Sequence, residues 1–295
     1  MPELPEVQTT VDGINREVAS LTIRDVWTDY RSLFHAKKNN IKNPEYFSHF
    51  KKDVIGAKIE RASRIGKNIL IHLSNHKTIL AHMKMTGFFF VSKKPESKHE
   101  HVHLIFTLRQ GSGQAPSNNK YLAFSDLRKF AKIFVFDTEN EKTIEDLMHL
   151  GPDPLSKIFT YDIFKKQLDK RPGWKIKPAL MNQELIAGIG NIYSDEMLWL
   201  AGIHPLSLVK KIPEPKLRVL YKNVRPLLKR GIKFGGDSDS DYRNIYGEPG
   251  QFQNKHNVYR KTGEKCSKKD GGKIERLKVG GRSAHFCPKH QKLYK

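Results

Sequence analysis

The sequence predicts an α+β protein in which a helix and a β-rich domain precede a helical domain and a small C-terminal module. Apolar residues recur every three or four positions over residues 4–18, which is typical of an amphipathic helix. The period then changes to two in several short segments separated by turns. From about residue 150 the helical spacing returns. We therefore expect three parts, at residues 1–135, 136–256 and 257–295.

The elements follow from local patterns. Pro5 suits the first turn of the N-terminal helix, where its missing N–H would have no partner. Paired glycines in 187–191 predict a tight turn between helices, and the polar, glycine-rich segment 235–253 predicts a mobile loop. A Gly271-Gly272 turn near the C-terminus indicates a hairpin. The expected strands are 69–73, 78–83, 87–92, 102–108, 121–125 and 132–136, and the later helices are 161–169, 191–201 and 213–229.

Charge and composition narrow the class of protein. Lys and Arg number 53 against 31 Asp and Glu, a net charge of +22. Such an excess predicts a polyanionic partner, most often nucleic acid, although a basic surface can also serve solubility alone. No apolar run approaches the roughly 18 residues of a membrane span, and two cysteines cannot form a disulfide framework. From the first residues we expect no secretory signal. We expect a monomer that is not secreted and lies in the cytoplasm or nucleoid, or in a nucleus.

The first residues of the chain could supply a nucleophilic amine with two carboxylates beside it. Removal of the initiator Met would leave Pro2 with a secondary amine, and α-amino groups titrate near about 8, so part of it would be nucleophilic at neutral pH. Such an amine can form a Schiff base with a sugar carbon. Glu3 and Glu6 beside it could act as general acids and bases. The same residues also suit the capping of a helix.

Two further groups of residues each have a functional and a purely structural interpretation. Lys67, on a glycine turn before a strand, could reach a phosphate or be an ordinary turn residue. Met85, Arg128 and Phe130 are residue types that wedge into a DNA stack and fill the space of an extruded base, although Met85 and Phe130 could instead be core residues.

The C-terminal module contains a partial metal-binding pattern. Cys287 and His290 have C-x-x-H spacing, whereas Cys266 has no cysteine partner and is followed by Asp270. Cys266, Asp270, Cys287 and His290 would be an acceptable but unusual zinc set. Two buried thiols without metal are the alternative.

In order and spacing, these motifs resemble the formamidopyrimidine-DNA glycosylases of the Fpg/Nei family. The resemblance covers nearly the whole chain in collinear order. It begins with Met1-Pro2-Glu3-Leu4-Pro5-Glu6-Val7 and continues through Gly66-Lys67, 82–87, 126–130, 151–155, 176–178, 188–193, 258–264 and 282–287.

The resemblance implies a β-sandwich carrying the N-terminal helix, followed by a helix–two-turn–helix domain with a β-hairpin finger. It implies that damaged double-stranded DNA lies in a basic cleft between them. Pro2 would attack C1′ of a flipped damaged nucleotide, and the Schiff base would allow β,δ-elimination of both phosphates. Glu3 would protonate the sugar ring oxygen, and Glu6 would assist proton transfers.

The resemblance also implies roles in DNA binding. Lys67, Asn191 and Arg282 match phosphate contacts around the lesion, and Lys177 resembles a further one. Met85, Arg128 and Phe130 match the residues that fill the void, with Arg128 facing the orphaned cytosine.

Three questions stay open. Many members of the family have four finger cysteines, so both a zinc finger and a metal-free finger are compatible with this sequence. Leu4 and the Met-Arg-Phe trio favour oxidised purines such as 8-oxoguanine and formamidopyrimidines over the oxidised pyrimidines of Nei-like enzymes. A catalytically silent damage-binding protein of the same fold is the remaining alternative.

Overall fold

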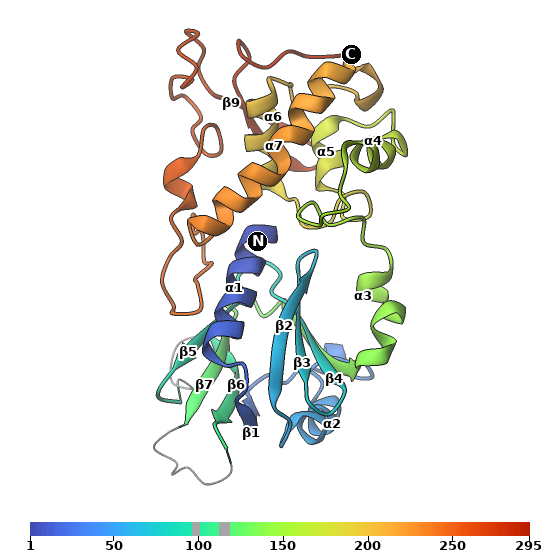
Figure 1. Cartoon of the computed structure of the whole chain (residues 1–295). Coiled ribbons are helices and arrows are strands. Elements are labelled where there is room, and N and C mark those ends of the chain that lie inside the picture. Colours follow the sequence, from blue (N-terminus) through green and yellow to red (C-terminus); the bar gives the residue numbers. More distant parts are fainter. Residues whose placement is uncertain (96–100, 112–118) are drawn as a thin grey trace. The chain divides into compact units, whose positions relative to one another are not determined.

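The computed structural model describes residues 1–95, 101–111 and 119–295, which divide into two units (Figure 1). Unit 1 comprises Met1–Met148 and Phe234–Gln251, and unit 2 comprises His149–Lys233 and Phe252–Lys295. The segment Phe234–Gln251 therefore belongs with the N-terminal half of the chain, although it follows the helices of unit 2 in sequence.

Unit 1 is a β-sandwich. Within the described residues it has two four-stranded antiparallel sheets, whose inner faces share one apolar core that includes Ile71 and Ile79 from one sheet and Leu104 and Phe124 from the other. This confirms the predicted sandwich. In one sheet the strand order is β1 (Thr22–Thr28), β6 (Val102–Arg109), β7 (Lys120–Ser125) and β5 (Phe88–Ser92). In the other it is β2 (Ile59–Ile65), β3 (Asn68–Leu73), β4 (Lys77–His82) and β8 (Lys132–Asp137).

Two helices cover the open edges of the sandwich. Helix α1 (Leu4–Glu17) contacts the edge strands β2 and β5, and α2 (Pro44–Val54) contacts the edge strands β1 and β8 (Figure 1). Covering edges in this way prevents pairing with other chains. The Asn15 side chain fixes α1 on β2, because it donates to the Ala62 carbonyl at 2.9 Å and accepts from the Ala62 N–H at 2.6 Å.

The six strands expected from alternation correspond to β3–β8 within one or two residues. Strands β1 and β2 were not expected, and each contains a register shift, between Ile23 and Asp25 and between Ile59 and Arg61. A bulge of this kind interrupts the period of two on which the sequence interpretation depends. The short helix α3 (Glu145–Met148) completes the regular elements of the first segment of unit 1.

Unit 2 consists of helices and a C-terminal hairpin, as predicted. Helix α6 is almost entirely buried, and it begins after a turn in which Gly188 has a φ of +93°. Helix α5 was too short to be found by its periodicity. The helices are α4 (Tyr161–Asp169), α5 (Ile176–Met181), α6 (Asn191–Ala201) and α7 (Glu214–Lys233).

The C-terminal hairpin turns at a different place from the one expected. Strands β9 (Glu275–Val279) and β10 (Arg282–Phe286) are joined by Gly280-Gly281, not by Gly271-Gly272. Both linking glycines have positive φ, at 55° and 77°, as a two-residue hairpin turn requires. In the described parts of the chain, no helix has the length and apolar character needed to cross a membrane.

Close packing of α7 on α6 depends on Gly231. A Cβ atom there would lie 2.5 Å from the hydroxyl of Tyr193, which is fully buried and stacked on Phe252. We predict that Gly231→Ala lowers the free energy of unfolding by about 1–2 kcal/mol, because the clash exceeds the gain in helix propensity. Gly173→Ala is the control, since no atom within the described ranges lies within 4 Å of that position. Chemical denaturation measures both, and equal stability of the two variants would contradict this packing.

Candidate active site and nucleic-acid interface

The start of α1 is buried together with its carboxylates. Pro2 is buried, and Glu3 and Glu6 are 2% and 1% exposed. They form a capping box, in which the Glu3 N–H donates to Glu6 Oε2 at 2.7 Å. The capping interpretation is therefore correct, and it also fixes two carboxylates next to Pro2. Met1 is 40% exposed, so burial does not prevent its removal.

Glu6 is enclosed by a distant segment of unit 1. Its Oε1 accepts the Asp237 N–H at 2.8 Å, and its backbone carbonyl accepts the Tyr242 hydroxyl at 3.1 Å. Burial, followed by the charge of Glu3, raises the pKa of Glu6 from its ordinary 4.5 to about 7. A carboxyl with this pKa can both donate and accept a proton at neutral pH.

The segment expected to be a mobile loop is largely anchored on unit 1. Ile245 is 1% exposed, its carbonyl accepts the Val91 N–H at 2.8 Å, and its side chain packs against Gly13. Sequence reasoning did not select Asp237, which is 5% exposed beside Glu6. The available signal was its place after Gly235-Gly236, both of which have positive φ.

Lys67 lies in the two-residue turn that joins β2 and β3, as predicted, and is 6% exposed. Arg64 connects this turn to α1, because its Nε donates to Gln8 Oε1 and its Nη1 to the Gly66 carbonyl, both at 3.0 Å. Burial, followed by the charges of Lys84 and Lys67, lowers the pKa of His82 to about 3. His82 is therefore neutral and adds no positive charge beside Lys67.

The proposed wedge residues share one buried anchor. Asp126 is 0% exposed; it accepts the Thr86 hydroxyl at 2.6 Å and the Ala131 N–H at 2.8 Å. Thr86 in turn accepts the Arg128 N–H at 3.1 Å, which ties the loop that follows Met85 to the segment 126–130, here called the wedge loop.

After the buried Asp126, the other side chains of the wedge loop are exposed. The Arg128 guanidinium lies 4.5 Å from the centre of the Phe130 ring, and Phe130 is 52% exposed, so it is not a core residue. Met85 is half-buried. An exposed aromatic ring covered by a guanidinium is suited to stacking against bases.

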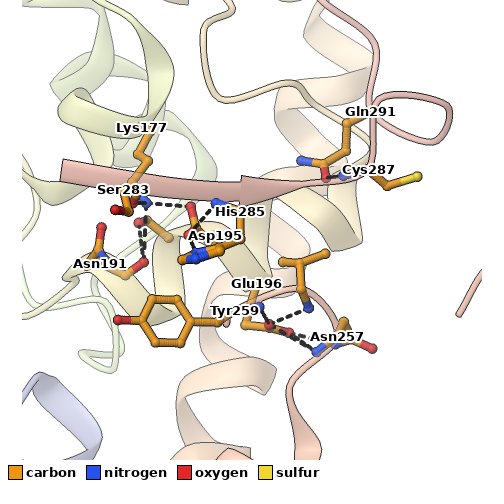
Figure 2. Close-up of polar contacts among 12 residues, drawn as sticks. Lys177, Asn191, Asp195, Glu196, Asn257, Tyr259, Ser283, His285, Cys287 and Gln291 are labelled. Carbon is orange, nitrogen blue, oxygen red and sulfur yellow. Dashed lines mark hydrogen bonds and ion pairs between the residues drawn. The ribbon is translucent and has the colours of Figure 1, made fainter. Parts of the chain in front are cut away.

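The structure gives Lys177 a role that differs from the expected phosphate contact. Its ammonium is completely buried and donates to Asp195 Oδ1 at 2.5 Å, to the Ser283 carbonyl at 2.9 Å and to the Asn191 carbonyl at 3.4 Å (Figure 2). Three acceptors use all three N–H donors. Lys177 is therefore a positioning residue, which holds the backbone at Asn191 and next to Arg282.

Asn191 and Arg282 lie on the two backbone segments that Lys177 holds in place. Asn191 is the first residue of α6, and its side-chain oxygen is buried without a hydrogen bond among the described residues. Such a group costs free energy unless a ligand or water completes it. Arg282 is exposed at the start of β10, directly after the hairpin turn.

Two adjacent carboxylates of α6 hold the C-terminal finger (Figure 2). Asp195 Oδ2 accepts the His285 N–H at 2.9 Å and lies 3.1 Å from the His285 ring nitrogen. The fully buried Glu196 accepts the backbone N–H groups of Asn257, Val258 and Tyr259 at 2.9–3.0 Å, as well as the Asn257 amide at 2.7 Å. Backbone donors converging on a carboxylate make strong hydrogen bonds.

Three of the four proposed metal ligands come together. The ligand atoms of Cys266, Asp270 and Cys287 lie within 4.8 Å of one another, and Cys287 Sγ is 3.9 Å from both Asp270 oxygens. Sulfur and oxygen ligands on tetrahedral zinc are about 3.6 Å apart, so these donors fit the ion. A Cβ at Gly272 would lie only 2.5 Å from Cys287 Sγ, so the glycine keeps space there.

His290 does not join this group in the described structure. Its Nε2 is 2.7 Å from the Trp199 carbonyl, which it contacts as a donor. Burial raises the pKa of the Cys287 thiol, which favours its protonated form when no cation is bound. The cluster therefore supplies three donors, and the expected fourth is used to hold the finger on α6.

Comparisons with known proteins agree with the fold and the motifs. Residues 1–133 match the family model for the formamidopyrimidine-DNA glycosylase N-terminal domain, and residues 150–243 match its H2TH domain. A formamidopyrimidine-DNA glycosylase of Bacillus licheniformis is 36% identical over 99% of this chain and 100% of its own length. One from Pelotomaculum thermopropionicum is 35% identical over the same shares.

Solved structures similar to this chain belong to the same family. Lactococcus lactis Fpg in complex with DNA containing an abasic site has a TM-score of 0.85 at 31% identity, covering 98% of this chain and 99% of that one. The same enzyme with DNA containing an oxidised pyrimidine has a TM-score of 0.84 at 31% identity, covering 99% and 100%. The fold and these matches define a DNA glycosylase of the two-domain type. The chain belongs to the formamidopyrimidine-DNA glycosylase family, which confirms the resemblance seen in the sequence.

The raised pKa of Glu6 predicts a pH-dependent stability. Because the folded-state pKa of about 7 exceeds the ordinary 4.5, protonated Glu6 favours the folded state. This stabilisation is complete below about pH 4.5 and is lost as pH rises through 7, by up to about 3 kcal/mol. The free energy of unfolding of Glu6→Gln minus that of wild type should therefore rise between pH 5 and 8 in urea titrations, on top of a pH-independent cost of placing an amide NH₂ beside the Glu3 and Asp237 N–H donors. The exposed Glu60→Gln is the control, and the same pH dependence in all three proteins would refute the assignment.

The anchoring by α6 predicts a finger that keeps its structure without metal. Treatment with a chelator should shift the melting temperature by less than about 2 °C. Glu196→Gln should cost about 3 kcal/mol, because an amide NH₂ would face backbone N–H donors. The exposed Glu184→Gln serves as the matched control. If chelation destabilises the protein as much as Glu196→Gln does, the metal and not the carboxylate holds the finger.

Proposed function

We propose that this protein is a bifunctional DNA glycosylase and AP lyase, which removes oxidised bases through a Schiff base on Pro2 and then cuts the strand. The observation that carries the proposal is the burial of two carboxylates, Glu3 and Glu6, directly beside Pro2 at the start of α1. A helix cap needs neither this degree of burial nor a carboxyl with a pKa of about 7.

The residues suit each step of the reaction. The Pro2 amine forms a bond to C1′ as the bond from C1′ to the damaged base breaks, and the base leaves with a proton. Glu3 protonates the ring oxygen, so the sugar opens to an iminium ion. Loss of a C2′ proton then expels the 3′ phosphate, and a second elimination expels the 5′ phosphate. Glu6 can accept and return protons in these steps, because its pKa is near neutrality.

The other predicted residues bind the DNA in this proposal. Lys67 on its turn and Arg282 after the hairpin contact phosphates, and the side-chain NH₂ of Asn191 donates to the same backbone. Met85, Arg128 and Phe130 fill the gap left by the extruded nucleotide, whose extrusion costs a few kcal/mol. The net charge of +22 supplies general attraction to DNA.

For the lesion, we propose oxidised purines such as 8-oxoguanine and formamidopyrimidines. Support comes from the family model that matches and from a related Lactococcus lactis structure that contains Fapy-dG. Another contains an oxidised pyrimidine, which keeps that substrate class as an outcome to be tested. The substrate implies that the enzyme works where DNA is kept, in the cytoplasm or nucleoid, or in a nucleus.

Zinc is the cofactor for which the finger has donors. Cys266, Asp270 and Cys287 would hold the ion, which would cross-link the two ends of the finger and supply no chemistry to the reaction. Elemental analysis of the purified protein measures its content.

Borohydride trapping tests the proposed reaction. Wild type should form a covalent adduct with a duplex that contains an abasic site, and Pro2→Gly should form little or none, because its primary amine lacks the geometry of the proline ring. Intact-mass measurement should first show that Met1 has been removed. Absence of an adduct with wild type would favour the silent damage-binding alternative.

Paired substrates test the lesion class. Cleavage of a duplex with 8-oxoguanine opposite cytosine should be at least about tenfold faster than cleavage of one with thymine glycol. The reverse order would assign the Nei-like activity instead.

A further inference from the structure

A basic cavity in unit 1 has no role in the reaction as described so far. Its volume is about 580 Å³, and its lining includes five lysines and a single acidic residue, Asp146. We call it the lysine pocket, defined by Lys37, Lys38, Lys42, Lys84 and Lys132. Pro2, Glu3, Glu6 and Lys67 do not line it, so it is separate from the candidate active site.

Most of the positive charge in the lysine pocket is not neutralised by protein. Asp146 lies 2.5 Å from Lys132 and compensates that residue. Among the described residues, Lys37, Lys38 and Lys84 form no ion pair. Such a concentration of ammonium groups is unfavourable unless solvent or an anion compensates it, and clusters of lysine are well suited to phosphate.

The pocket is attached to the wedge loop. Lys42 is 4% exposed, and its ammonium donates to the Lys129 carbonyl at 2.5 Å. Phe130 also lines the pocket. Burial lowers the pKa of Lys42, and the charge of Lys84 lowers it further, against the opposing effect of Asp126. A phosphate here would therefore stabilise the charged form of the residue that holds the wedge loop.

A neighbouring aromatic side chain points to the same class of ligand. Phe34 is 79% exposed, and the Lys38 ammonium lies 4.1 Å from the centre of its ring. Exposed rings among cationic side chains are typical of nucleic-acid surfaces.

We propose that the lysine pocket binds a backbone phosphate of the DNA strand opposite the lesion. The choice of strand follows from the wedge loop, whose Arg128 is assigned to the base left behind, and whose Lys129 and Phe130 adjoin the pocket. The inference rests on the proposed function. The proposed phosphate contact holds the wedge loop in position on the DNA while the base is extruded.

The test removes charge and keeps side-chain length. Lys37 has a φ of +63°, so Lys37→Gln with Lys38→Gln is chosen over smaller residues. The charge-matched control is Lys52→Gln with Lys93→Gln, at exposed positions in unit 1 that do not line the pocket. With duplex containing an uncleavable abasic-site analogue, the pocket variant should bind at least fivefold more weakly than the control. Its slope of log affinity against log salt should be smaller by about 1. Equal affinity and slope in the two double variants would overturn the proposal.

Neutral phosphates identify the strand. A single methylphosphonate placed in turn along each strand should weaken wild-type binding at one position opposite the lesion, and should have no further effect at that position in the Lys37→Gln, Lys38→Gln variant. Additive losses, or a coupled position only in the lesion strand, would overturn the proposal. Borohydride trapping of wild type on an abasic duplex, run in parallel, separates this result from a failure of the proposed function itself.

Discussion

Burial of the first turn of α1 is the constraint on which the candidate active site depends. Helix α1 covers the β2 and β5 edges of the sandwich, so its first residues cannot move without exposing the core. Glu3 and Glu6 cap the helix reciprocally, and Asp237 supplies a second backbone donor to Glu6. Two carboxylates are thus fixed next to Pro2 by the interactions that begin the helix. Their proximity and burial set the proton affinity of Glu6 near neutrality.

In unit 2, buried carboxylates also accept backbone N–H groups, but there they fix the C-terminal finger. The consecutive carboxylates Asp195 and Glu196 are buried on α6, and each accepts backbone donors from the C-terminal finger. Lys177 neutralises Asp195 and holds two carbonyls, which fixes the backbone on either side of the proposed phosphate contacts. This network is independent of the cysteines. It explains how a finger with an incomplete metal-binding pattern can still present Arg282.

Much of the fold was readable from periodicity, and the residues of the candidate site were proposed from motif order. Strands β3–β8 were found because each is a short apolar segment between turns, whereas β1 and β2, which each contain a register shift, were not found. The predicted residues in the first turn of α1 and at Lys67 lie in the elements expected for them. Lys177 was assigned to phosphate because a sequence does not reveal burial or the three acceptors around its ammonium. Asp237 is separated from Glu6 by more than two hundred residues, and only the return of segment Phe234–Gln251 to unit 1 brings them together.

The central claim is that burial beside Glu3 gives Glu6 a carboxyl that titrates near neutrality. Carbon-13 NMR of protein labelled at the glutamate carboxyl carbons measures this directly, with Glu6→Gln used to assign the resonance. The structure predicts a midpoint near pH 7 for Glu6 in the free enzyme. A Glu6 resonance that titrates below about pH 5, as an exposed glutamate does, would contradict the account.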